Sequence, residues 1–203
     1  MNFQLLTASL LLCLLLLVVP AFGQELFPIS GGTRTEPDPK DKKLMRLLAE
    51  NESYRITLGR PDHWRHKTAQ IVAIYMKLEN LSDKPISVQT SKFSAVDADG
   101  RAYSGLEAPE AIKRYFDTHS GAMTALGGAL GAGRSAREAA ERKVSEDIRR
   151  ESFPSGEIPP HSFKEGMVFF EAPKENRFTM KIKLADLWPE FFIFSTTKPE
   201  KTN

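Results

Sequence analysis

Apolar and polar residues alternate most clearly over residues 69–100, where short runs of alternation are separated by turn residues. Ile71 to Leu78 is apolar at nearly every position. Both faces of this strand are therefore expected to be buried, either at the centre of a sheet or beneath another element. Residues 80–85 and 97–100 carry the Asn, Asp, Ser, Pro and Gly residues of turns. The pattern predicts strand, turn, strand, strand, turn.

Other stretches show strand or helix periodicity. A short N-terminal helix is predicted over residues 40–50, from the helical spacing of Leu44, Leu47 and Leu48 after the capping pair Asp38 and Pro39. Strands with one buried face are predicted at 54–58 and 178–184. The segment 167–170 is apolar on both faces and is a candidate central strand. Residues 191–194 are predicted as a final strand or a docked tail.

An insertion over about residues 106–156 interrupts the strands with helical patterns. Helices are predicted at 108–116 and 135–152. Ile112 and Phe116 stack one turn apart in the first helix. Val144 and Ile148 belong to a thin apolar row on the second, which is otherwise covered with charge pairs at i, i+4. That helix is expected on the surface, where its apolar row is either lightly packed or a partner-binding stripe.

Between these helices, residues 118–133 contain no Asp, Glu, Lys or Arg and are rich in Gly and Ala. Gly127 and Gly131 form a small-x-x-x-small pair, which lets two helices approach closely. Glycine also destabilises a helix. Three alternatives stay open here: a flexible loop, a helix packed on its own domain, or a segment for self-association or membrane-surface contact.

The first 23 residues contain no charged side chain, and a continuous, mostly apolar run within them ends in small residues. This layout is typical of a secretory signal peptide cleaved after Gly23, which predicts an exported protein, periplasmic or secreted. No Lys or Arg precedes the apolar run, so an uncleaved membrane anchor is the alternative. Residues 24–40 are expected to be a flexible linker, and residues 196–203 a disordered tail.

Length and charge limit the remaining possibilities. Residues 41–195 fit one domain with a sizeable core. The net charge of +2 gives no argument for nucleic acid or for an anionic membrane. Nucleic acid is therefore not expected as a partner, and contact with a membrane is possible but not favoured. The single cysteine, Cys13, lies in the leader, so the mature chain is expected to have no disulfide.

Candidate chemistry is sparse. His63 and His66, with Asp62 beside them, are weak candidates for metal ligands, and His161 is a further candidate in space. The favoured interpretation of this stretch is a solvated connection with Trp64 against the sheet. No hydrolase, phosphate-loop, dinucleotide or zinc-protease motif is present, so we expect neither catalysis nor a cofactor.

A family resemblance runs through five stretches in order: YRITLG, VAIYMKLENLSDKPI, FSAVDADGRAY, IPPHSFKEGMVFFEAPK and FTMKIKL. Together they resemble exported bacterial immunoglobulin-like domains of unknown function, a group that includes a small secreted mycobacterial antigen. The resemblance implies an antiparallel β-sandwich outside the cytoplasm and no shared catalytic residues. The helical insertion departs from the family.

The expected protein is therefore a mainly β, exported, non-catalytic binding or structural module with an envelope or extracellular protein as its partner. The oligomeric state stays open. An alternative is a membrane-associated or self-associating envelope protein acting through residues 118–133. A remote alternative is a metal-dependent enzyme at His63 and His66. The partner-binding candidates are Ile112, Phe116, Gly127, Gly131, Val144 and Ile148.

Overall fold

The computed structural model describes residues 25–39, 42, 45–61, 64, 66, 70–117, 134–174, 177–182 and 190–197. This part of the chain is mainly β, with an α-helical pair between β8 and β9. The elements in chain order are β1 (Phe27–Gly31), β2 (Arg34–Pro37), β3 (Met45–Glu50), β4 (Tyr54–Gly59), β5 (Ile71–Asn80), β6 (Ile86–Val88), the 3₁₀ turn η1 (Thr90–Lys92), β7 (Ser94–Asp97), β8 (Ala102–Ser104), α2 (Ala108–Asp117), α4 (Arg134–Glu151), β9 (Gly156–Ile158), β10 (Phe163–Glu171), β11 (Arg177–Ile182) and β12 (Glu190–Ser195).

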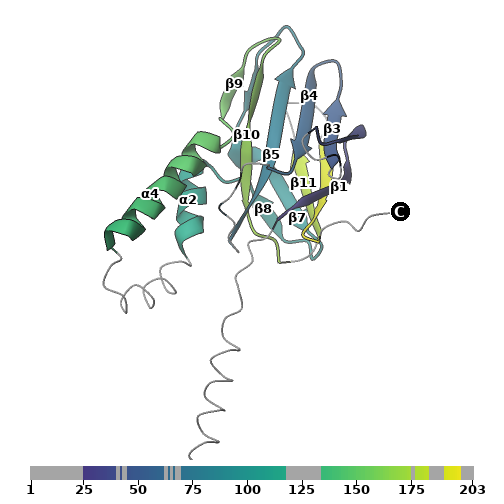
Figure 1. Ribbon diagram of the computed structural model, residues 1–203. Coiled ribbons are helices and arrows are strands. Elements are labelled where there is room, and N and C mark those ends of the chain that lie inside the picture. The colour runs from purple at the N-terminus through teal and green to yellow at the C-terminus, as the bar shows by residue number, and fades with distance from the viewer. Residues whose placement is uncertain are drawn as a thin grey trace, which may run out of the picture.

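The strands form two five-stranded antiparallel sheets and one short pair (Figure 1). The first sheet has the order β10-β5-β4-β3-β2, and the second has the order β1-β12-β11-β7-β8. Strands β6 and β9 pair with each other. The longest register joins β10 to β5, from Phe163 opposite Glu79 to Glu171 opposite Ile71. Strand β5 thus lies inside the first sheet, as its apolar sequence predicts.

One core lies between the two sheets, because alternate residues of both point toward each other. It is made almost entirely of aliphatic and aromatic side chains, and most of them are fully buried. The first sheet contributes, among others, Leu47, Ile56, Leu58, Val72, Ile74, Met76, Leu78, Val168 and Phe170, and the second contributes Ala95, Tyr103, Phe178, Met180, Ile182, Phe192 and Phe194.

A second apolar cluster lies on the other face of β5 and β10. Ile71, Ala73, Met167 and Phe169 point away from the main core and are covered by the insertion. Figure 1 shows α2 and α4 side by side against this flank of the sheet. The expectation that this strand is covered on both faces is confirmed at Ile71 and Ala73, whereas Tyr75 and Lys77, further along the same outer face, are only partly buried. The two helices of the insertion are confirmed as well.

Strand β10 is the end strand of the first sheet, not a central one as expected from its apolar residues. Its free edge is occupied by the two ends of the insertion. The N–H of Leu106 donates to Phe169 O at 2.8 Å, and the N–H of Phe153 donates to Met167 O at 2.8 Å. These bonds and the helices bury a strand that would otherwise be exposed, which explains its composition.

The helix predicted over residues 40–50 is wrong for residues 45–50, which form strand β3. This strand pairs with β2 on one side and β4 on the other. Leu47 and Leu48 are both buried, on opposite faces. The two adjacent leucines therefore reflect a strand with a buried side chain on each face rather than the apolar stripe of a helix.

The linker predicted over residues 24–40 is also wrong for its greater part, because β1 and β2 lie within it. Strand β1 belongs to the second sheet and β2 to the first, so the chain crosses between sheets at Gly31 and Gly32. Both glycines have positive φ, 127° and 69°. A Cβ on Gly32 would lie 2.0 Å from Leu48 O. The glycines thus permit a close crossing, not a flexible tether.

The turn at residues 97–100 is confirmed. The Asp97 carboxylate accepts the N–H groups of Asp99 and Arg101 on one oxygen and the Tyr103 hydroxyl, at 2.7 Å, on the other. Gly100 takes a φ of 83°. The Tyr103 hydrogen bond is the main reason why the pKa of Asp97 is below its ordinary value. The residue stabilises the turn by local hydrogen bonds, as its sequence predicts.

Candidate functional site

The outer face of the first sheet changes character along its strands. On β5 the outward residues run from Ile71 and Ala73, beneath the helices, to Tyr75, Lys77 and Glu79 beyond them. Helices cover the apolar half and leave the polar half open. The open half defines the candidate site, which we name the charged face: Arg34, Glu36, Arg46, Glu50, Arg55, Tyr75, Lys77 and Glu79.

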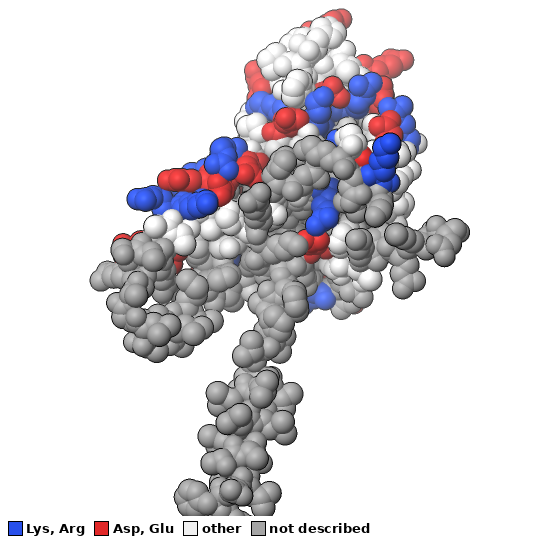
Figure 2. Space-filling model, viewed as in Figure 1, with Lys and Arg blue, Asp and Glu red and all other residues white. Residues whose placement is uncertain are grey.

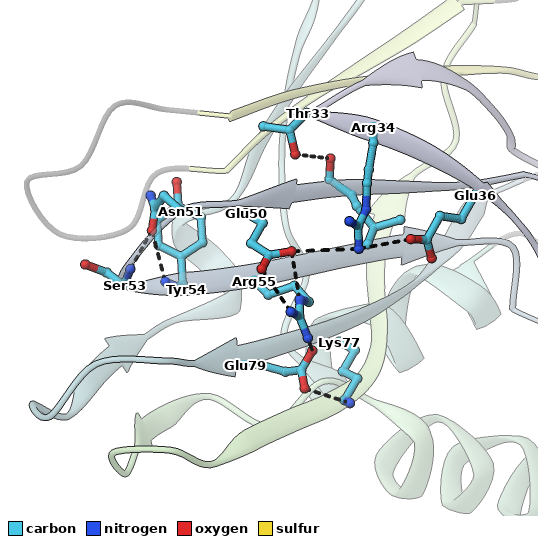
Figure 3. A network of polar contacts seen from close by, with 11 residues as sticks. Thr33, Arg34, Glu36, Glu50, Asn51, Ser53, Tyr54, Arg55, Lys77 and Glu79 are labelled. Atoms are coloured by element: carbon cyan, nitrogen blue, oxygen red, sulfur yellow. Dashed lines mark hydrogen bonds and ion pairs between the residues drawn. The ribbon is translucent and has the colours of Figure 1, made fainter.

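Ion pairs connect the strands of the charged face (Figure 3). Arg55 of β4 is central, with its guanidinium 2.9 Å from Glu50 of β3 and 3.6 Å from Glu79 of β5. Arg34 of β2 lies 3.0 Å from Glu36 and 3.8 Å from Glu50. Lys77 lies 3.1 Å from Glu79. Acidic and basic side chains therefore alternate across neighbouring strands.

The Arg55–Glu50 contact has the strongest geometry in this network. Two guanidinium nitrogens of Arg55 donate to the two carboxylate oxygens of Glu50, at 3.0 and 2.9 Å. This hydrogen bonding lowers the pKa of Glu50 and raises the pKa of Arg55 from their ordinary values. Both groups are charged at neutral pH, and the fork geometry fixes the orientation of the guanidinium.

A shallow hollow of about 390 Å³ lies on the charged face. Besides the charged residues, its lining includes Thr57, Leu48 and the prolines of β2 and its end, Pro37 and Pro39. The Arg46 guanidinium lies 5.6 Å from the centre of the Tyr75 ring and donates to Asp38 at 2.7 Å. The Tyr75 hydroxyl donates to Glu165 at 2.7 Å. The hollow thus combines an aromatic ring with fixed charges.

Charged side chains also cover the exposed surface of the docked helix α4. Figure 2 shows Lys and Arg interleaved with Asp and Glu along α4 and over the upper part of the visible face. On the inner side of α4, Asp147 accepts a hydrogen bond from His66 in the segment before β5, with 2.8 Å between Nε2 and Oδ2. That bond is the main reason why the pKa of Asp147 is below its ordinary value.

The histidines do not come together as a metal site in the described chain. His66 faces Asp147, and its ring meets Trp64 edge-on at 5.2 Å. His161 pairs instead with Asp83, at 2.9 Å, in an exposed position. His63 and Asp62 lie outside the described residues. Among the described residues no three His, Cys, Asp or Glu side chains gather as metal ligands. Trp64 packs against Phe169, as expected.

The predicted partner-binding residues are placed mainly at the helix–sheet contact. Ile148 is fully buried there, so a partner cannot reach it while α4 is docked. Ile112 and Val144 are partly buried and pack against the same cluster. Phe116 is half-buried, with its ring 5.0 Å from that of Tyr115. Gly127 and Gly131, with the whole segment 118–133, lie outside the described residues.

Sequence reasoning did not find the charged face. The sequence did carry a signal for it. On two predicted strands, polar residues alternate with apolar neighbours, which places Arg55 with Thr57, and Lys77 with Glu79, on the outer face. The face also needs β2 and β3, which were predicted as linker and helix. Without those strands the paired charges do not meet.

No helix within the described ranges has the length and apolar character needed to cross a membrane.

Comparison with known proteins finds similar structures but no matching family. No protein-family model matches the chain, and no curated protein matches it. Among solved structures, it is similar to a functionally unknown protein from Listeria monocytogenes EGD-e, with 5% identity, a TM-score of 0.37, and coverage of 79% of this chain and 78% of that one. It is also similar to a conserved hypothetical protein from Bacillus anthracis, with 11% identity, a TM-score of 0.36, and coverage of 71% and 90%.

Proposed function

We propose that the chain is an exported, non-catalytic binding module, an immunoglobulin-like β-sandwich that binds an envelope or extracellular protein through the charged face. The uncharged leader supports export, and the shared core of two antiparallel sheets supports the sandwich. The observation that carries the binding role is the open charged face, where fixed Arg and Glu side chains surround a hollow beside the docked helices.

The chemistry of the charged face suits a protein partner. Arg and Tyr are enriched at protein interfaces and carry much of the binding energy there. Arg55 is already held by Glu50, and Arg46 by Asp38. Side chains that are ordered before binding lose less conformational entropy on association. Because the face mixes both signs of charge, the partner surface is expected to be mixed as well.

A site-specific photo-crosslinker tests this proposal in the native envelope. It is placed at Thr57, inside the hollow, and in a matched variant at Asp99, exposed in a turn of the second sheet. The proposal predicts one discrete protein adduct at Thr57 that excess unlabelled protein suppresses, and none at Asp99. The same adducts at both positions, or no adduct at Thr57, contradict it.

A further inference from the structure

The outer face of the second sheet differs in composition from the charged face. Alternate residues of its five strands point away from the core, and among those the structure describes none is acidic. Arg177 and Lys181 of β11 are the ionic side chains of this face in the described chain. The outward residues are Phe27, which is buried, and Ile29, Ser30, Ser94, Val96, Ala102, Ser104, Arg177, Thr179, Lys181, Phe191, Ile193 and Ser195.

A continuous row of uncharged side chains crosses this sheet. Ile193 of β12 lies opposite Thr179 of β11, Thr179 opposite Val96 of β7, and Val96 opposite Ala102 of β8. On β1, Pro28 pairs with Phe194 and Ser30 pairs with Ile193. Ile29 lies between them, at an irregularity in the register, and so stands beside Ile193. We name this row the uncharged band: Ile29, Ile193, Thr179, Val96 and Ala102.

Large apolar side chains on this face are strongly exposed. Ile29 is 50% exposed, Phe191 51% and Val96 39%, and these are three of the four large exposed hydrophobic residues of the described chain. Single exposed apolar residues are ordinary on protein surfaces, but a gathered patch marks an interaction surface. This patch lies on one side of one sheet, so a flat apolar surface matches it.

Charge decides which occupant fits. Lys181 lies beside the uncharged band, with its Nζ 5.7 Å from the centre of the Phe191 ring, and Arg177 is exposed on the same strand. A second copy packed face to face would bring these cations together on strands whose described outward residues include no carboxylate. The nearby Glu25 carboxylate is already paired with Arg60, 2.9 Å away, whose guanidinium lies over Phe27. A bilayer with anionic lipids instead offers phosphates to the cations and an apolar layer to Phe191.

We infer that the outer face of the second sheet docks on an anionic lipid surface. Phe191, Ile29 and Val96 enter the headgroup region, and Lys181 and Arg177 contact lipid phosphates. The contact is peripheral and salt-sensitive, because few charges and half-exposed side chains carry it. It is separate from the protein-binding charged face, which stays open on the first sheet. Export places the protein where such a surface is available.

Vesicle flotation of the processed, exported protein tests this inference. The chain supplies matched pairs, because each sheet has a Lys side chain over an exposed Phe: Lys181 over Phe191, and Lys77, at 4.4 Å, over the 52% exposed Phe163. Phe191→Ser is compared with Phe163→Ser. Lys181→Glu is compared with Lys84→Glu, a change of equal charge in an exposed turn.

Binding to phosphatidylcholine vesicles containing phosphatidylglycerol is expected to exceed binding to pure phosphatidylcholine, and to weaken at high salt. Lys181→Glu is expected to weaken it by about tenfold and Phe191→Ser by about fivefold. Each control is expected to stay within about twofold. If Phe191→Ser lowers the melting temperature, the comparison of Lys181→Glu with Lys84→Glu alone tests the inference. No lipid-dependent binding, equal loss in the controls, or a dimer that Lys181→Glu dissociates would each overturn the inference.

Discussion

The outer faces of the two sheets face solvent in different ways. On the first sheet, the apolar half is covered by α2 and α4, and the other half carries Arg55, Glu50 and their neighbours in ion pairs. On the second sheet, no described helix covers the outer face, and Val96 and Phe191 remain exposed. One core therefore supports two different surfaces. The ion-paired face of the first sheet suits a protein partner, and the exposed apolar face of the second sheet suits a lipid surface.

The largest expected effect concerns the helices that cover half of the first sheet. Ile148→Ala leaves a cavity beneath α4, where this side chain is fully buried. We expect a loss of about 2–5 kcal/mol in the free energy of unfolding. The exposed neighbour Arg149→Ala is the control, expected within about 0.5 kcal/mol. Equal urea midpoints for the two variants would mean that the helices do not depend on this contact.

The crossing between the two sheets gives the next effect. Gly32→Ala forces a Cβ against Leu48 O at a φ of 69°, whereas Gly100, at 83°, has no atom within 4 Å of an added Cβ. We expect Gly100→Ala to cost about 1 kcal/mol and Gly32→Ala about 3 kcal/mol, measured by chemical denaturation. Similar costs at both positions would refute a tight crossing there.

The second sheet keeps an acid on its inner side, which predicts a pH effect. The pKa of Asp97 is lowered in the folded protein, mainly by the Tyr103 hydrogen bond. Its carboxylate therefore adds stability above the unfolded pKa, and this stability is lost as the pH falls through the folded pKa. Between about pH 5 and pH 3, the free energy of unfolding should fall more in the wild type than in Asp97→Asn.

Asp99→Asn, in the same turn, is the matched control for this acid titration and should follow the wild type. An identical pH profile for Asp97→Asn and the wild type would show that the Asp97 hydrogen bonds contribute nothing to the stability of the second sheet.

The smallest expected effect is on the stability of the charged face. Glu50 and Arg55 are partly solvated, so Arg55→Met is expected to change the free energy of unfolding by less than about 1 kcal/mol. Thermal melts at low and high salt measure it. A loss of several kcal/mol would indicate that the network holds the fold rather than serving a partner.

Sequence pattern predicted most of the strands and both helices, because strong periodicity reflects burial. Ile71 to Leu78 is the best case, since its apolar residues on both faces correctly required a covering element. The predictions were wrong where the spacing of apolar residues does not report which face of an element is buried, or where turn residues form a tight crossing. Leu47 and Leu48 are buried on opposite faces of a strand, and Gly31 with Gly32 resembles a linker while forming a tight crossing.

The candidate site was less predictable for a related reason. Arg34, Glu50, Arg55 and Glu79 come from four strands and meet only through pairing registers. No local motif records those registers. The uncharged band has the same property, because Val96 and Ile193 are joined only through β11. Residues chosen from helix periodicity, such as Ile148, instead proved to lie at the internal helix–sheet contact.

Partner affinity across the two faces tests the central claim most directly. With the crosslinked partner purified, its dissociation constant is measured for the wild type, Arg55→Ala, Arg101→Ala and Lys181→Glu. Arg101 forms its own ion pair, with Glu171, outside the charged face. We predict that Arg55→Ala weakens binding at least tenfold, while the other two stay within about twofold. Unchanged affinity for Arg55→Ala, or a larger loss for Lys181→Glu, would contradict the account.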